Sequence, residues 1–176
     1  GALLGADERR DVAEWLSALS QRETVTPRGE SRFPGTSEWV FRHALVREAA
    51  YSMLTPDDCE RMISLAHASL AHWRERADCT AQNLSISYWQ ASRVYAVLGQ
   101  AANARHYGRL CLDVSGAEPP FFPGYAHEAL ARAEQLAGNS AAAQRHLAEA
   151  RRLAALVTDA EERRALENDL AGLAGS

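Results

Sequence analysis

The chain has 176 residues, of which 47% are hydrophobic and 24% charged, with a formal net charge of -4. This length suffices for one domain with a hydrophobic core or for two smaller units. The negative charge offers no basic surface for nucleic acid, and no apolar run approaches the roughly 18 residues of a membrane span. The sequence also begins without the basic and apolar regions of a secretory signal, so we expect a cytoplasmic protein.

Arginine provides all 19 of the Lys+Arg residues, because the sequence contains no lysine. Chemistry that requires lysine, such as phosphate binding in a P-loop or Schiff-base formation, is therefore excluded from this chain. His127 and Glu128 begin an HExxH zinc-protease pattern, but its last position is Ala131. The GxSxG and GxGxxG motifs are also missing. We expect no catalytic residue, no cofactor and no metal.

The N-terminal third combines helix-like and strand-like patterns. Apolar residues at helical spacing predict a helix over Asp7–Leu19. Two strand-like segments, Thr24–Arg28 and Glu38–Arg42, flank a loop rich in glycine, serine and proline, and they predict a β-hairpin. A second helix is predicted over His43–Leu54.

The stretch FRHALVREAAYSML, which ends at Leu54, resembles a segment of bacterial STAND signalling ATPases that follows their nucleotide-binding domain. In that family a winged-helix module leads into a repeat sensor region. The resemblance implies that residues 1–55 form a partial winged-helix-like segment made of a helix, a β-hairpin and a helix. The P-loop and the acidic Mg²⁺ motif of the family's ATPase core are missing from this chain, so the resemblance implies a regulatory arm without its motor.

Residues 56–176 are predicted to form a second, entirely helical domain. Ser140 or a neighbour is expected to cap one of its helices, and Thr158 with Glu161 to form a capping box for the last one. A proline-rich break is expected over Ser115–Pro123. The predicted helices run from the turn at Thr55–Asp58 to about Arg76, and over Ser85–Gly99, Ala101–Val114, Tyr125–Gly138, Ser140–Val157 and Asp159–Leu170.

An internal repeat appears when Gly99 is aligned with Gly138, an offset of 39 residues that also places Ala104 opposite Ala143. The glycine and the small residue five positions later resemble the tetratricopeptide consensus, whose period of about 34 residues is here lengthened by a five-residue insertion. A further 34 residues lead from Gly138 to Gly172, so the last helix is predicted to cap the stack.

The stretch from about Leu65 to Leu170 also resembles a group of uncharacterised bacterial tetratricopeptide proteins. We therefore expect a mainly α fold in which residues 56–176 form a tetratricopeptide-like, right-handed stack of antiparallel helical hairpins. One small N-terminal β-hairpin precedes this stack.

In a tetratricopeptide stack the first helix of each repeat lines a concave groove. Arg93 and Arg132 are equivalent positions of that groove, and two stacked guanidinium groups with aromatic rings nearby are suited to an acidic peptide or a C-terminal carboxylate. In the alternative interpretation Trp89 belongs to the core and Arg132 pairs with Glu128. The predicted partner-binding residues are Trp89, Arg93, Tyr125, Glu128 and Arg132.

The leading hypothesis is a non-catalytic protein–protein interaction module that binds a protein or peptide partner, without nucleic acid or membrane. The alternative is a regulatory or sensor arm of a STAND-type signalling ATPase or transcriptional regulator. Two or three repeats make a short stack, so self-association through an exposed end is a further expectation.

Overall fold

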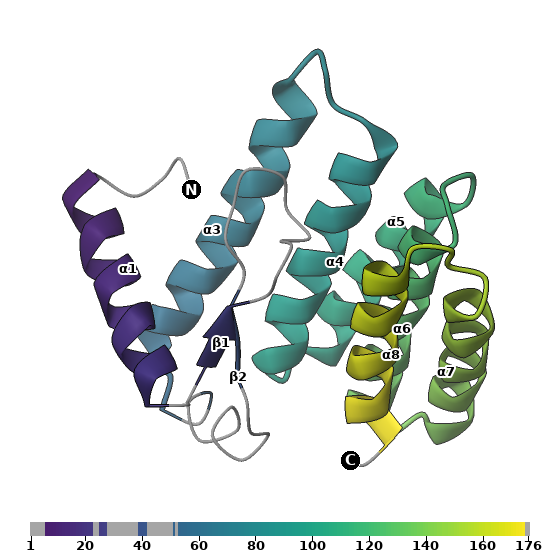
Figure 1. Cartoon of the computed structure of the whole chain (residues 1–176). Coiled ribbons are helices and arrows are strands. Elements are labelled where there is room, and N and C mark those ends of the chain that lie inside the picture. The colour runs from purple at the N-terminus through teal and green to yellow at the C-terminus, as the bar shows by residue number, and fades with distance from the viewer. Residues whose placement is uncertain (1–5, 23–24, 28–38, 42–50, 52, 175–176) are drawn as a thin grey trace. The chain divides into compact units, whose positions relative to one another are not determined.

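The structure is a computed structural model of the whole chain, and its described residues are 6–22, 25–27, 39–41, 51 and 53–174. These residues are mainly helical, which confirms the mainly α prediction (Figure 1). The chain divides into two compact units, Gly1–Thr55 and Pro56–Ser176. Within the described ranges, none of the helices combines the length and the apolar character that crossing a membrane requires.

The first unit contains helix α1 (Ala6–Gln21) and two short strands, β1 (Val25–Pro27) and β2 (Trp39–Phe41). The strands pair antiparallel with Val25 opposite Phe41, and α1 packs against β1. Both strands lie inside the segments predicted to form a β-hairpin. Of residues 43–54, the structure describes only 51, 53 and 54, so the helix predicted there lies almost wholly outside the described residues.

The second unit is a succession of helices joined by short connections (Figure 1). Helix α3 packs against α4, and α4 against α5, while α6 packs against α4, α5 and α7. The last helix, α8, packs against both α6 and α7. The bounds of these helices are Pro56–Glu75 (α3), Ala81–Val97 (α4), Ala101–Ser115 (α5), Phe121–Leu136 (α6), Ser140–Ala154 (α7) and Ala160–Ala174 (α8).

The turns after α4 and α6 have the same backbone geometry. Gly99 and Gly138 have φ angles of 73° and 75°, in the left-handed region that glycine adopts without steric cost. In each turn the amide of the residue after the glycine donates to the carbonyl five residues earlier, at 2.9 and 2.8 Å. This is the bonding pattern of a Schellman cap. The 39-residue offset found in the sequence therefore relates two structurally equivalent turns.

We predict that Gly99→Ala and Gly138→Ala will each lower the free energy of unfolding by about 1 kcal/mol, because alanine is strained at positive φ. Apart from the two adjacent residues, nothing lies within 4 Å of a Cβ added at either position, so the effect isolates backbone strain. Gly172→Ala is the matched control. Gly172 lies within α8, where alanine favours the helix by up to about 1 kcal/mol. Urea unfolding followed by circular dichroism measures all three, and a stabilised Gly138→Ala variant would contradict the turn geometry.

Two predicted boundaries are wrong because of Pro123 and Gly172. Helix α6 begins at Phe121, so Pro123 lies in its first turn, where the backbone N–H groups have no partner within the helix and a proline is tolerated. Helix α8 continues through Gly172 to Ala174, so the 34-residue step from Gly138 to Gly172 does not lead to another turn.

The predicted caps are also corrected. Asp159, rather than Thr158, caps α8, because its Oδ1 accepts the amides of the second and third residues after it, both at 2.9 Å. Ser140 is the first residue of α7, and no side chain caps that helix. Helix α4 has a reciprocal cap that was not predicted: the Thr80 side chain accepts the Asn83 amide, and the Asn83 side chain accepts the Thr80 amide.

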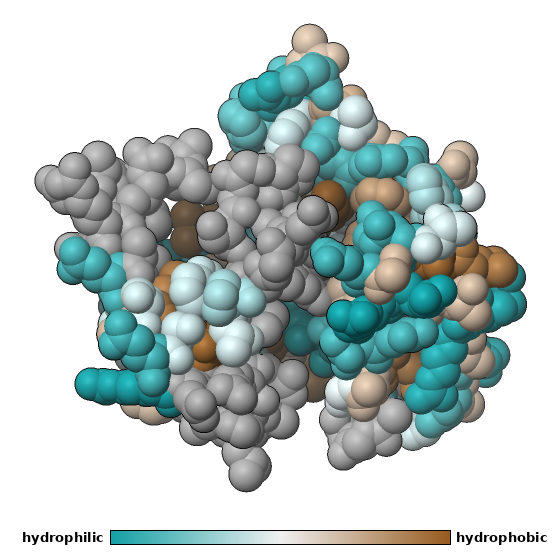
Figure 2. All heavy atoms as spheres, in the orientation of Figure 1, coloured by the Kyte–Doolittle hydropathy of each residue, from teal (hydrophilic) through white to brown (hydrophobic). Residues whose placement is uncertain are grey.

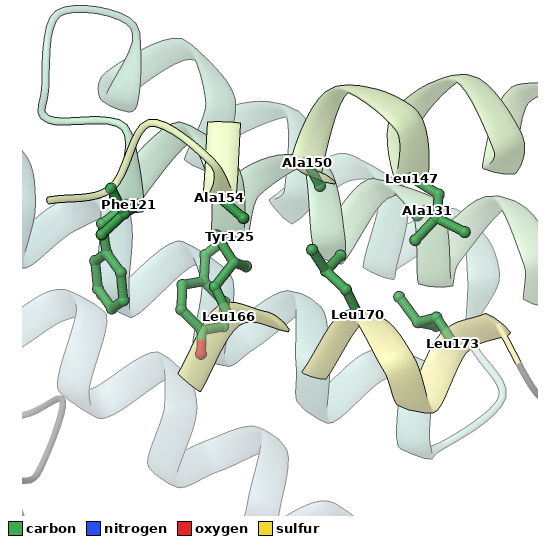
Figure 3. Close-up of a cluster of buried hydrophobic side chains, with 10 residues drawn as sticks. Phe121, Tyr125, Ala131, Leu147, Ala150, Ala154, Leu166, Leu170 and Leu173 are labelled. Carbon is green, nitrogen blue, oxygen red and sulfur yellow. The ribbon is translucent and has the colours of Figure 1, made fainter. Parts of the chain in front are cut away.

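The largest core cluster joins α6, α7 and α8. Leu166, Leu170 and Leu173 of α8 point toward side chains of α6 and α7 (Figure 3). Gly124 permits this approach, because a Cβ there would lie 2.6 Å from Cδ2 of Leu166. The opposite face of α8 is exposed and polar, and hydrophilic residues cover much of the described surface in that region (Figure 2). The exposed residues of that face include Arg163, Arg164, Glu167 and Asn168.

Candidate functional site

The five residues predicted to bind a partner lie together on two packed helices. Trp89 and Arg93 belong to α4, and Tyr125, Glu128 and Arg132 belong to α6. Spacings of three or four residues place each set on one face of its helix, and α4 contacts α6 directly. We refer to these five residues as the Glu128 cluster.

Glu128 is the centre of the cluster, and its side chain is buried completely. Its Oε2 accepts a hydrogen bond from Trp89 Nε1 at 3.0 Å, while its Oε1 accepts Arg93 Nη1 at 3.2 Å and Arg132 Nε at 3.1 Å. Arg132 Nη2 contacts the same Oε1 as an ion pair. Both carboxylate oxygens are therefore bonded, and one carboxylate connects α4 to α6.

The charge of Glu128 follows from two opposing effects on its pKa. Burial alone would raise the pKa of this carboxyl group, but the positive charges of Arg132 and Arg93 outweigh that effect and hold the pKa below its ordinary value. Glu128 is therefore ionised at neutral pH. A buried carboxylate is stable here because two guanidinium groups and an indole N–H replace its water shell.

Two aromatic rings form one side of the cluster. The rings of Trp89 and Tyr125 pack edge to face with centroids 5.4 Å apart. The Tyr125 hydroxyl donates to Asp169 Oδ2 of α8 at 2.9 Å. This hydrogen bond connects the cluster of α4 and α6 to α8.

Exposure differs sharply between the acid and the bases. The side chains of Arg93 and Arg132 are each 22% exposed, whereas that of Glu128 is 1% exposed. Part of each arginine side chain therefore reaches solvent, whereas the Glu128 carboxylate does not. The two arginines are brought together as the repeat register predicts, but they share Glu128. The pair between Arg132 and Glu128, considered from the sequence as a structural alternative, is present.

Sequence reasoning missed several residues whose partners depend on helix packing. Asp169 was not predicted to meet Tyr125, 44 positions earlier. Arg105 of α5 binds both carboxylate oxygens of Glu134 of α6, at 2.6 and 2.9 Å. No local motif marks either pair, because each forms only when two helices pack in one register.

The buried thiol and hydroxyl groups of the α4–α5 interface have a packing role. Burial raises the pKa of Cys111 to about 11, so its thiol is protonated at neutral pH and a poor nucleophile. The hydroxyls of Ser85 and Ser115 lie 2.7 Å apart, and Ser115 donates to the Cys111 carbonyl at 2.6 Å. These short side chains let α4 and α5 approach closely while every buried hydroxyl keeps a partner.

Comparison with known proteins adds no family assignment. No protein-family model matches the chain, and neither a curated protein nor a solved structure matches it. The tetratricopeptide and STAND resemblances therefore stay predictions, and the Glu128 cluster is the basis for assigning a function.

Proposed function

We propose that residues 56–174 form a tetratricopeptide-like, non-catalytic interaction module that binds an acidic peptide or a C-terminal carboxylate at the Glu128 cluster. One observation carries this proposal. Trp89 and Glu128 are 39 residues apart, as are Arg93 and Arg132, and all four side chains meet around one carboxylate. Equivalent positions of the two predicted repeats therefore combine into a single polar cluster.

The arrangement of the helices supports a repeat stack. The two equivalent turns at Gly99 and Gly138 close the pairs α4–α5 and α6–α7. The first helices of these pairs, α4 and α6, contact each other, and α8 contacts α6 on the other side. In a tetratricopeptide stack such first helices line the groove that holds a peptide, and the contact between α4 and α6 supports the proposal that a ligand binds at the Glu128 cluster.

The chemistry of the cluster favours a carboxylate ligand. A guanidinium group has five N–H donors in a planar fork that matches a carboxylate. Arg132 uses its Nε and Nη2 groups for Glu128, and among the described residues its Nη1 group has no hydrogen-bond acceptor, so we assign that group to a ligand. The half-buried indole ring of Trp89 beside the arginines offers an apolar surface for the rest of a peptide chain, whereas the ring of Tyr125 is buried in the core and only supports Trp89.

Peptide binding by charge variants tests this proposal. The probes are short synthetic peptides rich in aspartate and glutamate with a free C-terminus, compared with amidated and glutamine-substituted versions by fluorescence polarisation. The variant Arg93→Gln/Glu128→Gln/Arg132→Gln removes all three charges, and we expect it to weaken binding of the acidic peptides at least about tenfold. Glu128→Gln alone keeps both arginines and should strengthen that binding.

Opposite effects of the triple variant and of Glu128→Gln, which differ only in the two arginines, distinguish a binding site from a structural ion pair, which would alter stability alone. Arg151→Gln, on an exposed position of α7, is the matched control and should bind like the wild type. Circular dichroism establishes that each variant is folded at the assay temperature. Equal affinity for acidic and neutral peptides, or unchanged binding by the folded triple variant, would refute the proposal.

A further inference from the structure

A pair of histidines connects α6 to α7 on residues that the Glu128 cluster does not use. The Nδ1 atoms of His127 and His146 lie 2.9 Å apart, and both side chains are half-buried. The ring centroids are 5.2 Å apart. The distance between the ring centres exceeds the distance between the two Nδ1 atoms by about twice the distance from an imidazole centre to its nitrogen. The two Nδ1 atoms therefore lie close to the line between the ring centres and point at each other.

Such a head-to-head contact can hold only one proton. In a neutral pair one ring carries its proton on Nδ1 and donates it, while the other carries its proton on Nε2 and accepts. The first added proton binds the Nε2 atom of the donating ring, which becomes an imidazolium ion and still donates its Nδ1 proton to the neutral ring, so a singly charged pair keeps the hydrogen bond. When both rings are imidazolium ions, a donor faces a donor and a positive charge faces a positive charge.

A shared proton fits this geometry better than a metal ion. A tetrahedral zinc ion with Zn–N bonds of about 2.0–2.1 Å would hold the two nitrogens roughly 3.3 Å apart and away from their common axis. Among the described residues, no group of three potential metal ligands includes this pair.

The charges around the pair come from three helices. Burial, followed by the charge of His146, lowers the pKa of His127, and burial also lowers the pKa of His146. The two glutamates nearby oppose these effects, and the arginines reinforce them. Helix α8 also packs against α6 and α7, but it contributes no charge that acts on either ring. The charged groups acting on the pair are Arg109 of α5, Glu134 of α6, and Arg145, Glu149 and Arg152 of α7.

We propose that the pair of His127 and His146 is a proton-sensitive latch, which joins α6 to α7 at neutral pH and opens when both rings become charged. The hydrogen bond between the two histidines uses none of the polar contacts of the Glu128 cluster, so the latch can be tested without a peptide ligand. His127 nevertheless precedes Glu128 on the same helix, so opening the latch would loosen the hairpin that presents the cluster.

The direction of the pH effect follows from linkage. Both rings have pKa values lower in the folded state than in the unfolded state, so unfolding takes up protons as the pH falls. The full stability is present above the unfolded pKa of about 6.5, and it is lost as the pH falls toward and through the folded pKa values. For each extra proton that the unfolded state binds, the ratio of folded to unfolded protein falls about tenfold for every unit by which the pH is lowered.

The first test compares the pH dependence of stability in matched variants. His127→Gln/His146→Gln can keep a hydrogen bond between two amides but does not titrate. Stability is measured by urea unfolding of the full chain between about pH 7.5 and pH 5. As the pH falls, the wild type should lose stability more steeply than this variant. The difference should reach up to about tenfold in the ratio of folded to unfolded protein per pH unit, for each extra proton that the unfolded state binds. His106→Gln, at an exposed position of α5, should follow the wild-type profile. Parallel profiles of the wild type and the double variant would overturn the latch.

A second test needs no substitution. ¹⁵N-imidazole NMR of the wild type at neutral pH reports which nitrogen of each histidine carries the proton. The latch requires opposite tautomers, one ring protonated at Nδ1 and the other at Nε2. Two rings protonated only at Nε2 would overturn it, whatever the stability of the variants.

Discussion

Glu128→Gln is expected to lower the free energy of unfolding by about 3 kcal/mol, because it leaves two arginines around a neutral group in a buried site. This is the lower end of the range for breaking a buried ion pair, since both arginine side chains reach solvent in part. Urea unfolding at neutral pH measures the change. The stability from this carboxylate should also disappear in acid: it is present above about pH 4.5, and it is lost as the pH falls through the depressed folded pKa.

An exposed ion pair provides the control for this prediction. Asp78 pairs with Arg76 at the surface, where both side chains are well exposed, so Asp78→Asn should leave the unfolding free energy nearly unchanged. If Glu128→Gln behaved like Asp78→Asn, the carboxylate would not be the structural link between α4 and α6 that its contacts indicate.

Leu166→Ala is expected to cost about 3–5 kcal/mol, because this side chain is fully buried in the cluster that attaches α8 to the stack. The cost combines the lost apolar contact with the cavity that remains. Urea unfolding of the wild type and the variant at neutral pH measures it. A cost below about 1 kcal/mol would show that α8 is not held by this core.

Gly124 extends that prediction to a double-mutant cycle. Gly124→Ala should destabilise the wild type by about 1–3 kcal/mol, because the new Cβ would lie 2.6 Å from Cδ2 of Leu166. In the Leu166→Ala background the colliding methyl group is gone, so the same change should be neutral or stabilising. Simple additivity of the two substitutions would contradict the close contact of α6 with α8.

The sequence predicted the periodic parts of the fold well. Regular apolar spacing and the paired glycines predicted the helices of the second unit and the equivalence of the turns at Gly99 and Gly138. Both glycines have positive φ angles, which favour glycine over other residues and so explain why the paired glycines were an informative signal in the sequence. At the helix ends the sequence was less informative, because Pro123 is tolerated in a first turn and Gly172 within a helix.

For the candidate site, the sequence predicted which residues lie together but not which hydrogen bonds they form. The repeat register selected Trp89, Arg93, Glu128 and Arg132, because equivalent positions of two packed helices come close together. That one buried carboxylate would accept bonds from the other three depended on side-chain geometry, which the register does not specify. The pairing of His127 with His146 likewise required the relative rotation of α6 and α7.

The most direct test of peptide binding at the Glu128 cluster is an NMR titration of the ¹⁵N-labelled full chain with a short acidic peptide. The indole N–H of Trp89 and the Nε–H of Arg132 are resolved probes that already contact Glu128. We predict that both signals shift in a saturable manner with the free-carboxylate peptide and much less with its amidated, glutamine-substituted version. Signals that stay in place while the peptide binds elsewhere, or respond equally to both peptides, would contradict a carboxylate-binding role for this cluster.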